Sequence, residues 1–159
     1  MSISLSNLEK YKIKLRKNDV LCMTGDVNHD LYYIISGTLL ICVNQKRQIT
    51  PIAYLGPNEY LGELSFIDHM DRSAHIIALE DSEVIKIPSA EFKTQVPRWL
   101  RRIAKKITAK IRLMDEIIQQ NGIRKKNVES IKPLSIEDQR TFFNSLEEYK
   151  KKNNQAFKP

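Results

Sequence analysis

Hydrophobic and polar positions alternate along the chain, or the hydrophobic ones gather in short runs, from about residue 12 to residue 88. The runs are rich in Ile, Val, Tyr and Leu, as the strands of antiparallel sheets are. Stretches with Gly, Asn, Asp and Pro separate them and supply the backbone angles of tight turns. The pattern predicts a mainly β domain, a small sandwich or roll, with strands in "YKIKL", "DVLCM", "LYYII", "TLLICV", "QITPIAYL", "AHIIAL" and "EVIKI".

After Pro88 the hydrophobic period changes to between three and four residues. "SAEFKTQV" predicts two helical turns with Ser89 as N-cap. A long amphipathic helix is predicted over 97–121, ending before Gly122. A stripe of this kind is typical of a helix packed on a partner, so we expect a homodimer through it; the alternative is packing on the chain's own sheet. The stripe consists of Leu100, Ile103, Ile107, Ile111, Met114 and Ile118.

The remaining residues, 123–159, form a basic tail. Ser135, with Asp138 three residues later, resembles a capping box and predicts a short helix over about 135–150. That helix carries too much apolar surface for a solvated helix, so we expect it to dock on the β domain or on another protein. The apolar residues are Phe142, Phe143, Leu146 and Tyr149.

The net charge of +7 is unevenly distributed. Residues 1–97 hold 10 Lys and Arg against 12 Asp and Glu, so all the excess positive charge follows residue 97. A basic surface there favours an acidic partner, nucleic acid or anionic lipid, and a solvated polar helix and tail explains the charge equally well.

The chain of 159 residues has room for one domain and an extension. Its apolar runs are too short to cross a bilayer and its start lacks a secretory signal pattern, so we expect a cytoplasmic protein. Cys22 and Cys42 lie in apolar runs and are expected to be buried free thiols. His29, His69 and His75 lack metal-ligand spacing, so no metal site is predicted.

The stretch "LGELSFIDHMDRSAH", 61–75, combines three residue types that suit a nucleotide. Gly62 allows a close backbone approach, and a helical turn from Glu63 would direct free N–H groups at an anion. Arg72 adds a planar fork of donors suited to a phosphate, and Glu63 can accept hydrogen bonds from a sugar hydroxyl. No nucleophile, base and orienting residue can be grouped, so the sequence does not predict an enzyme.

This stretch resembles the phosphate-binding cassette of the cyclic nucleotide-binding domain, a family that includes bacterial catabolite activator proteins, regulatory subunits of cAMP-dependent kinase and cyclic-nucleotide-gated channels. The motif Gly-Glu-Leu-small is followed by Arg-Ser-Ala. "LCMTGDVNHDLYYIISG" and "LGPNEYLGE" resemble two further family signatures. The sequence departs from the family pattern at Asn28, Asn58 and Phe66. The motif residues are Gly62, Glu63, Leu64, Ser65, Arg72, Ser73 and Ala74.

The resemblance implies an eight-stranded antiparallel β-roll over 8–122, including the long helix. Glu63 would accept from the ribose 2′-OH, Arg72 would pair with the cyclic phosphate, and Ser73, Ala74, Gly62 and Leu64 would complete the anion site. Ile111, Met114 and Asp115 of the long helix would be neighbours of the base. No cofactor is implied; the ligand would be cAMP or cGMP.

The sequence thus predicts a sensor that binds a cyclic mononucleotide and relays binding through the long helix and tail to a protein partner. The alternative is an interaction module that keeps the fold but needs no nucleotide, with Glu63 and Arg72 forming an ion pair on an empty scaffold. The residues after Gly122 are too few for a winged helix-turn-helix, so a direct DNA-binding regulator is not expected.

Overall fold

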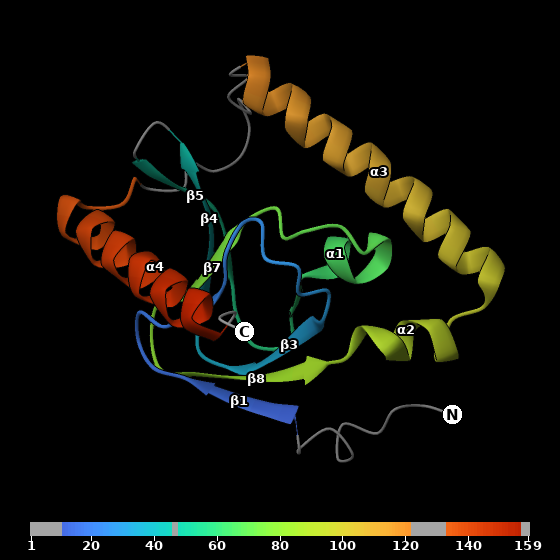
Figure 1. Ribbon diagram of the computed structural model, residues 1–159, viewed down its shortest axis with the longest axis horizontal. Helices are drawn as coiled ribbons and strands as arrows, with labels where there is room; N and C mark the ends of the chain where they lie inside the picture. The colour runs from blue at the N-terminus through green and yellow to red at the C-terminus, as the bar shows by residue number, and fades with distance from the viewer. Residues whose placement is uncertain (1–10, 46–47, 122–132, 157–159) are drawn as a thin grey trace.

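The computed structural model describes residues 11–45, 48–121 and 133–156 (Figure 1). In this part the chain forms eight strands, paired antiparallel in two four-stranded sheets, and four helices. The predicted β-roll is confirmed. The strands are β1 (Lys12–Leu15), β2 (Val20–Cys22), β3 (Leu31–Ser36), β4 (Leu39–Gln45), β5 (Gln48–Leu55), β6 (Tyr60–Leu61), β7 (His75–Ala78) and β8 (Ser82–Ile87), and the helices are α1 (Glu63–Asp68), α2 (Ser89–Gln95), α3 (Arg98–Asn121) and α4 (Ile136–Ala156).

The two sheets have the strand orders β1-β8-β3-β6 and β2-β7-β4-β5. Alternate side chains of each sheet point into a shared core, because successive residues of a strand face opposite sides. Leu15, Tyr32, Ile34, Leu61 and Val84 come from the first sheet; Cys22, Leu39, Ile76 and Ala78 come from the second.

Each of the seven predicted runs contains a strand, and the eighth strand, β6, has only two residues. It pairs with β3 through Tyr32 and Tyr33. Two residues are too few to show a hydrophobic period, so only the family resemblance predicted an eighth strand. Pro51 is accommodated because β5 is an edge strand of its sheet.

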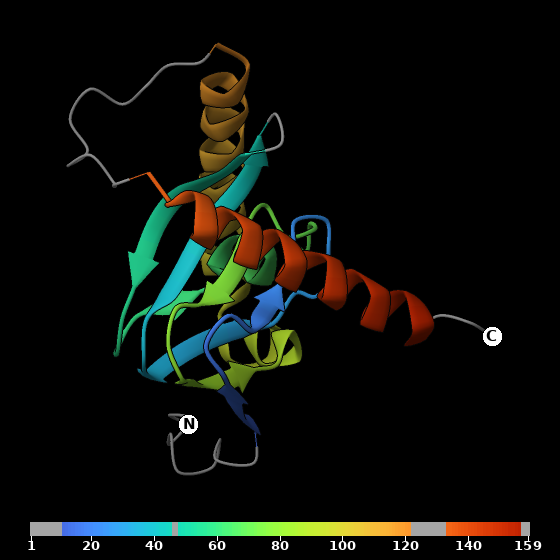
Figure 2. The same cartoon turned by 90° about the vertical axis from the view of Figure 1, so that its left-hand side faces the viewer.

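The second sheet is covered on its outer face by α4, as Figure 2 shows. Phe142 and Leu146 of α4 are buried against Leu40, Ile49 and Ile77. At the polar edge of this contact, the Gln139 amide donates to the carbonyl oxygen of Ile49 and accepts from its N–H, both at 2.8 Å. The apolar residues of the tail therefore dock on the roll, one of the two predicted outcomes.

The helix predicted over about 135–150 is present, but its predicted C-terminal end is wrong, since α4 continues to Ala156. Nothing between Tyr149 and Ala156 breaks a helix, because the segment contains neither Gly nor Pro. The division of the chain at residues 8–122 and 123–159 stays a prediction. Its residues 8–10, 122–132 and 157–159 lie outside the described part.

Candidate functional site

The cassette follows β6 and leads through α1 and a loop to β7. Gly62 is the N-cap of α1 with a φ of 83°, in the left-handed region that glycine adopts without strain. Its carbonyl oxygen accepts the first helical hydrogen bond, from the N–H of Phe66 (3.1 Å). The helical turn predicted from Glu63 is present.

Arg72 lies inside the roll and is only 4% exposed. Its Nη1 donates to the carbonyl oxygen of Gly62 (3.1 Å). Its Nη2 donates to the carbonyl oxygen of Asp30 (2.5 Å) and to Oδ1 of Asn28 (3.1 Å). The guanidinium carbon stands 5.4 Å from the centre of the Tyr32 ring, within range of a cation–π contact. Arg72 Nε is buried and has no hydrogen-bond partner.

Gly62 and Arg72 fit each other closely. A Cβ on residue 62 would collide with Nη1 of Arg72 and lie 3.1 Å from the carbonyl oxygen of Asp30. Sequence reasoning assigned Gly62 to a close approach of a ligand. The structure gives a reason within the chain as well, since only glycine leaves space for the guanidinium.

The loop before β3 holds the main chain of Arg72. The N–H of Arg72 donates to the carbonyl oxygen of Asp26 (3.0 Å), and its carbonyl oxygen accepts from the N–H of Gly25 (2.8 Å). The side chain of Asp26 accepts from the N–H of Met23 (2.8 Å) and from the hydroxyl of Tyr149 in α4 (2.8 Å). Helix α4 therefore contacts the loop that positions the arginine.

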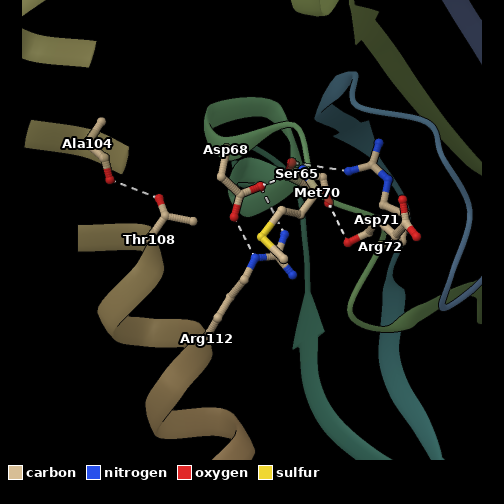
Figure 3. A network of polar contacts seen from close by, with 9 residues as sticks. Ser65, Asp68, Met70, Asp71, Arg72, Ala104, Thr108 and Arg112 are labelled. Carbon is tan, nitrogen blue, oxygen red and sulfur yellow. Dashed lines mark hydrogen bonds and ion pairs between the residues drawn. The ribbon is translucent and has the colours of Figure 1, made fainter. Parts of the chain in front are cut away.

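The other motif residues surround this centre at different depths. Glu63 is exposed at the start of α1, and it forms no ion pair with Arg72. Ser65 is buried and its hydroxyl donates to the carbonyl oxygen of Asp71 (3.2 Å), as Figure 3 shows. Ser73 is exposed, whereas Leu64 and Ala74 are half-buried. The structure thus brings Gly62 and Arg72 into contact and leaves Glu63 and Ser73 facing solvent.

Helix α3 is joined to α1 by a forked ion pair. Arg112 donates through Nε to Oδ2 of Asp68 (2.5 Å) and through Nη2 to Oδ1 (3.1 Å), as Figure 3 shows. Burial alone would raise the pKa of Asp68, but the hydrogen bonds and charge of Arg112 outweigh it and lower this pKa. One turn earlier, Thr108 is buried and its hydroxyl donates to the carbonyl oxygen of Ala104 (2.9 Å).

The residues predicted as neighbours of the base, Ile111, Met114 and Asp115, are all exposed. Thr108 and Arg112 are instead the buried and half-buried residues of this part of α3. The described side chains of the apolar stripe, from Leu100 to Met114, do not pack on the roll, since Ile107 is 53% exposed and Met114 is 60% exposed.

Several residues of the arginine network were not predicted as site residues. Asn28, Asp30 and Tyr32 lie 40 or more positions before Arg72 in the sequence. No local pattern joins residues so far apart. The polar character of "NHD" directly before the apolar run "LYYII" is the signal that could have directed attention to this loop.

Three further residues bear on the chemistry of the roll: His29, Cys22 and Cys42. His29 Nε2 is buried without a hydrogen-bond partner, and its ring packs edge-on against His69. Burial raises the pKa of both Cys22 and Cys42 to about 12, so neither thiol is prepared for nucleophilic chemistry.

Among the described residues, no cluster of His, Cys, Asp or Glu has metal-binding geometry. No helix in the same part of the chain is long and apolar enough to cross a bilayer.

The β-roll and its buried arginine lie within a segment that matches a known domain family. Residues 12–97, more than half of the chain, match the cyclic nucleotide-binding domain. The chain belongs to the cyclic nucleotide-binding domain family.

Individual proteins show the same relationship. The cyclic AMP receptor protein of Thermus thermophilus is 33% identical over 75 residues, which are 46% of this chain and 35% of that protein. Lysophospholipase NTE1 of Cryptococcus neoformans is 34% identical over 79 residues, which are 50% of this chain and 5% of that protein.

Among solved structures, the EAL enzyme Bd1971 in its cAMP-bound form has a TM-score of 0.58 and 24% identity, covering 70% of this chain and 31% of that chain. Its cGMP-bound form has a TM-score of 0.52 and 26% identity, covering 70% and 34%. This chain spans about a third or less of each of these four proteins and structures.

Proposed function

We propose that the chain is a non-enzymatic sensor module that binds cAMP or cGMP at the cassette. The cyclic phosphate would pair with Arg72, and the exposed carboxylate of Glu63 would accept from the ribose hydroxyl. Ser73, Ala74, Leu64 and Gly62 would complete the anion site. The domain family and the names of similar proteins support a cyclic nucleotide as the ligand.

The observation that carries this proposal is the buried charge of Arg72. Among the described residues no Asp or Glu carboxylate forms an ion pair with it. Burying a charge without a counter-ion is costly, and carbonyl oxygens compensate this cost only in part. A bound anion would supply the missing charge and a partner for Nε.

Calorimetry of the purified protein against cAMP, cGMP and cyclic dinucleotides tests the proposal. Arg72→Ala should weaken binding by at least about thirtyfold, because removing one partner of a buried charge pair costs ~2 to 5 kcal/mol. Arg72→Lys should also bind poorly, since an ammonium lacks the planar fork. Glu63→Gln should cost less, as an amide oxygen still accepts.

Arg16→Ala is the matched control, because Arg16 is an exposed arginine on the same domain. Its affinity should equal that of the wild type. Binding that survives Arg72→Ala undiminished would refute the assignment of the site.

We propose further that binding is relayed through α3 and α4. The cassette contacts α3 through the Asp68–Arg112 pair, and the loop that holds Arg72 contacts α4 through Tyr149. A ligand that shifts the cassette would change both contacts. A protein partner would bind the tail. While α4 is docked on the roll, Phe142 and Leu146 are buried and do not contact that partner.

The exposed apolar stripe of α3 supports a homodimer through this helix. Ile107→Asp should dissociate the dimer in light scattering without unfolding the roll. Ala109→Asp adds the same charge at another exposed position of α3 and should leave the dimer intact. A wild-type monomer at tens of micromolar would contradict the proposal.

The same stripe favours the second candidate, an interaction module that needs no nucleotide. Its signature would be a dimer or complex that forms normally together with an absence of binding heat for every cyclic nucleotide. In that case Arg72→Ala would change only the melting temperature.

A further inference from the structure

Asn28 connects three parts of the arginine network. Its Oδ1 accepts from the N–H of Asp30 (2.8 Å) and from Nη2 of Arg72 (3.1 Å). Its Nδ2 donates to the hydroxyl of Tyr32 (2.7 Å), whose ring faces the guanidinium. The amide is therefore held on both sides while one lone pair is directed at the arginine.

The donors of Arg72 leave no complete edge for an anion. A guanidinium has five N–H groups, and a two-pronged contact uses either the Nε–Nη2 edge or the Nη1–Nη2 edge. Nη2 belongs to both edges, and its two N–H groups already bond to Asn28 and Asp30. An anion can take the fork only when one of these acceptors leaves.

Asp30 is the acceptor that stays. Its contribution is a main-chain carbonyl, and its carboxylate is anchored by the N–H of Ser89 (3.0 Å) and by Nζ of Lys86 (2.9 Å). Asn28 contributes a side chain, which rotation about its own χ angles can withdraw without moving the backbone. An oxygen that replaced Asn28 at Nη2 would also reach the unpartnered Nε on the same edge.

We propose that Asn28 is a competitor of the ligand anion: its amide oxygen occupies the place of a phosphate oxygen on Arg72. Asn28 is thus a positioning residue that lowers the affinity of the site for anions. The inference rests on the proposed function in taking this anion to be the cyclic phosphate.

The first test is the order of affinities in a series at residue 28. Asn28→Ala removes the competitor and should bind cAMP or cGMP about tenfold more tightly, which corresponds to about 1.4 kcal/mol. Asn28→Asp introduces a carboxylate that pairs with Arg72 and should bind about tenfold more weakly. Asn44→Ala, at an exposed position of β4, is the control and should bind as the wild type does.

Tyr32→Phe is a second variant that keeps Asn28 and its contact with Asp30. It removes the hydroxyl that orients the amide and retains the ring beneath the guanidinium. We expect a gain of about threefold, in the same direction as Asn28→Ala and equal to about half of its change in binding free energy.

A second measurement needs no ligand. Phenylglyoxal modifies accessible arginines, and peptide mass spectrometry gives the rate at Arg72. This rate should be low in the wild type and rise several-fold in Asn28→Ala, while exposed Arg16 reacts equally in both. The concentrations of cAMP, cGMP and inorganic phosphate that protect Arg72 are measured in the same assay.

The outcomes separate the inference from the proposed function. An unchanged rate at Arg72 in Asn28→Ala overturns the inference whatever the nucleotides do. The inference is also overturned if the wild type binds cAMP or cGMP but affinity does not decrease from Asn28→Ala through the wild type to Asn28→Asp. In that case the proposed function stands. If inorganic phosphate follows that order and no cyclic nucleotide binds, the inference stands and the proposed function fails.

Discussion

The two C-terminal helices, α3 and α4, differ in the exposure of their apolar residues. In α4, Phe142 is 2% exposed and forms part of a core cluster of the second sheet. In α3, the described side chains of the apolar stripe are exposed, and the buried and half-buried side chains in the middle of the helix are Thr108 and Arg112. Figure 1 shows the consequence: α4 lies across the sheet, while α3 extends beyond α1.

This difference assigns the helices different physical roles. Apolar burial is non-directional and adds to the core, so α4 acts as a structural layer of the roll. A forked ion pair is directional, and the pair that Arg112 forms depends on the position of α1. We therefore expect the attachment of α3 to depend on the cassette.

Phe142→Ala should have the largest effect. Loss of a buried phenylalanine costs about 3 to 5 kcal/mol of unfolding free energy, which urea denaturation measures. Ile107→Ala is the matched control on α3 and should change the stability of the monomer by less than about 0.5 kcal/mol. Equal costs for the two variants would show that α4 does not pack on the sheet in solution.

Asp68→Asn should loosen α3 and leave α4 in place. The variant removes the charge that Arg112 contacts, and hydrogen bonds to charged groups contribute about 2 kcal/mol. Amide hydrogen exchange should become faster in α3 and remain unchanged in α4. Asp71→Asn, at an exposed position next to Arg72, is the control. Faster exchange in both helices would contradict independent attachment.

The docking of α4 was partly predictable from the strands it covers. The segment "LLICV" in β4 is an uninterrupted apolar run, and such runs are typical of strands buried on both faces. Leu39 faces the inter-sheet core and Leu40 the cluster beneath α4. The sequence thus indicates that a second layer covers the outer face of β4. It does not identify this layer as α4 or as a partner, since either would bury the same face of the strand.

The site residues that lie close together in the sequence were predictable. The contacts between residues far apart in the sequence were not. Gly62, Glu63 and Arg72 lie within one short motif, so the family resemblance could indicate them together. The partners of Arg72 and of Arg112, namely Asn28 and Asp68, are each 44 residues away in sequence. Such contacts depend on strand pairing and on how α3 leaves the roll, which periodicity does not determine.

Tyr149→Phe should have a smaller effect than either variant above. The variant removes the hydrogen bond to the Asp26 carboxylate and keeps the ring, so about 1.5 kcal/mol of stability is lost, the lower end for a hydrogen bond to a charged group. Burial and then the hydrogen bond to the Asp26 carboxylate raise the pKa of Tyr149, so the hydroxyl stays protonated through the neutral range. Tyr54→Phe, at an exposed position of β5, should be neutral in the same urea titration. An equal loss in both variants would remove the proposed contact of α4 with the arginine loop.

Mild acid should produce the smallest effect and should act near the α4 contact, not on the α3 attachment. His75 on β7 accepts from the N–H of Thr24 through Nδ1 (3.1 Å), and burial lowers its pKa below the ordinary value of 6.5. The folded protein therefore binds fewer protons than the unfolded chain as the pH falls below 6.5, and stability declines until the lowered pKa is passed.

Asp68 behaves differently, because its pKa lies below the ordinary value of 3.8 and its contribution to stability is fully present above that pH. Between pH 6.5 and 5, unfolding free energy should decline while hydrogen exchange in α3, corrected for intrinsic rates, stays constant. His75→Asn offers an acceptor without a titrating ring and should abolish the decline; a decline of the same size in His75→Asn would place its origin elsewhere.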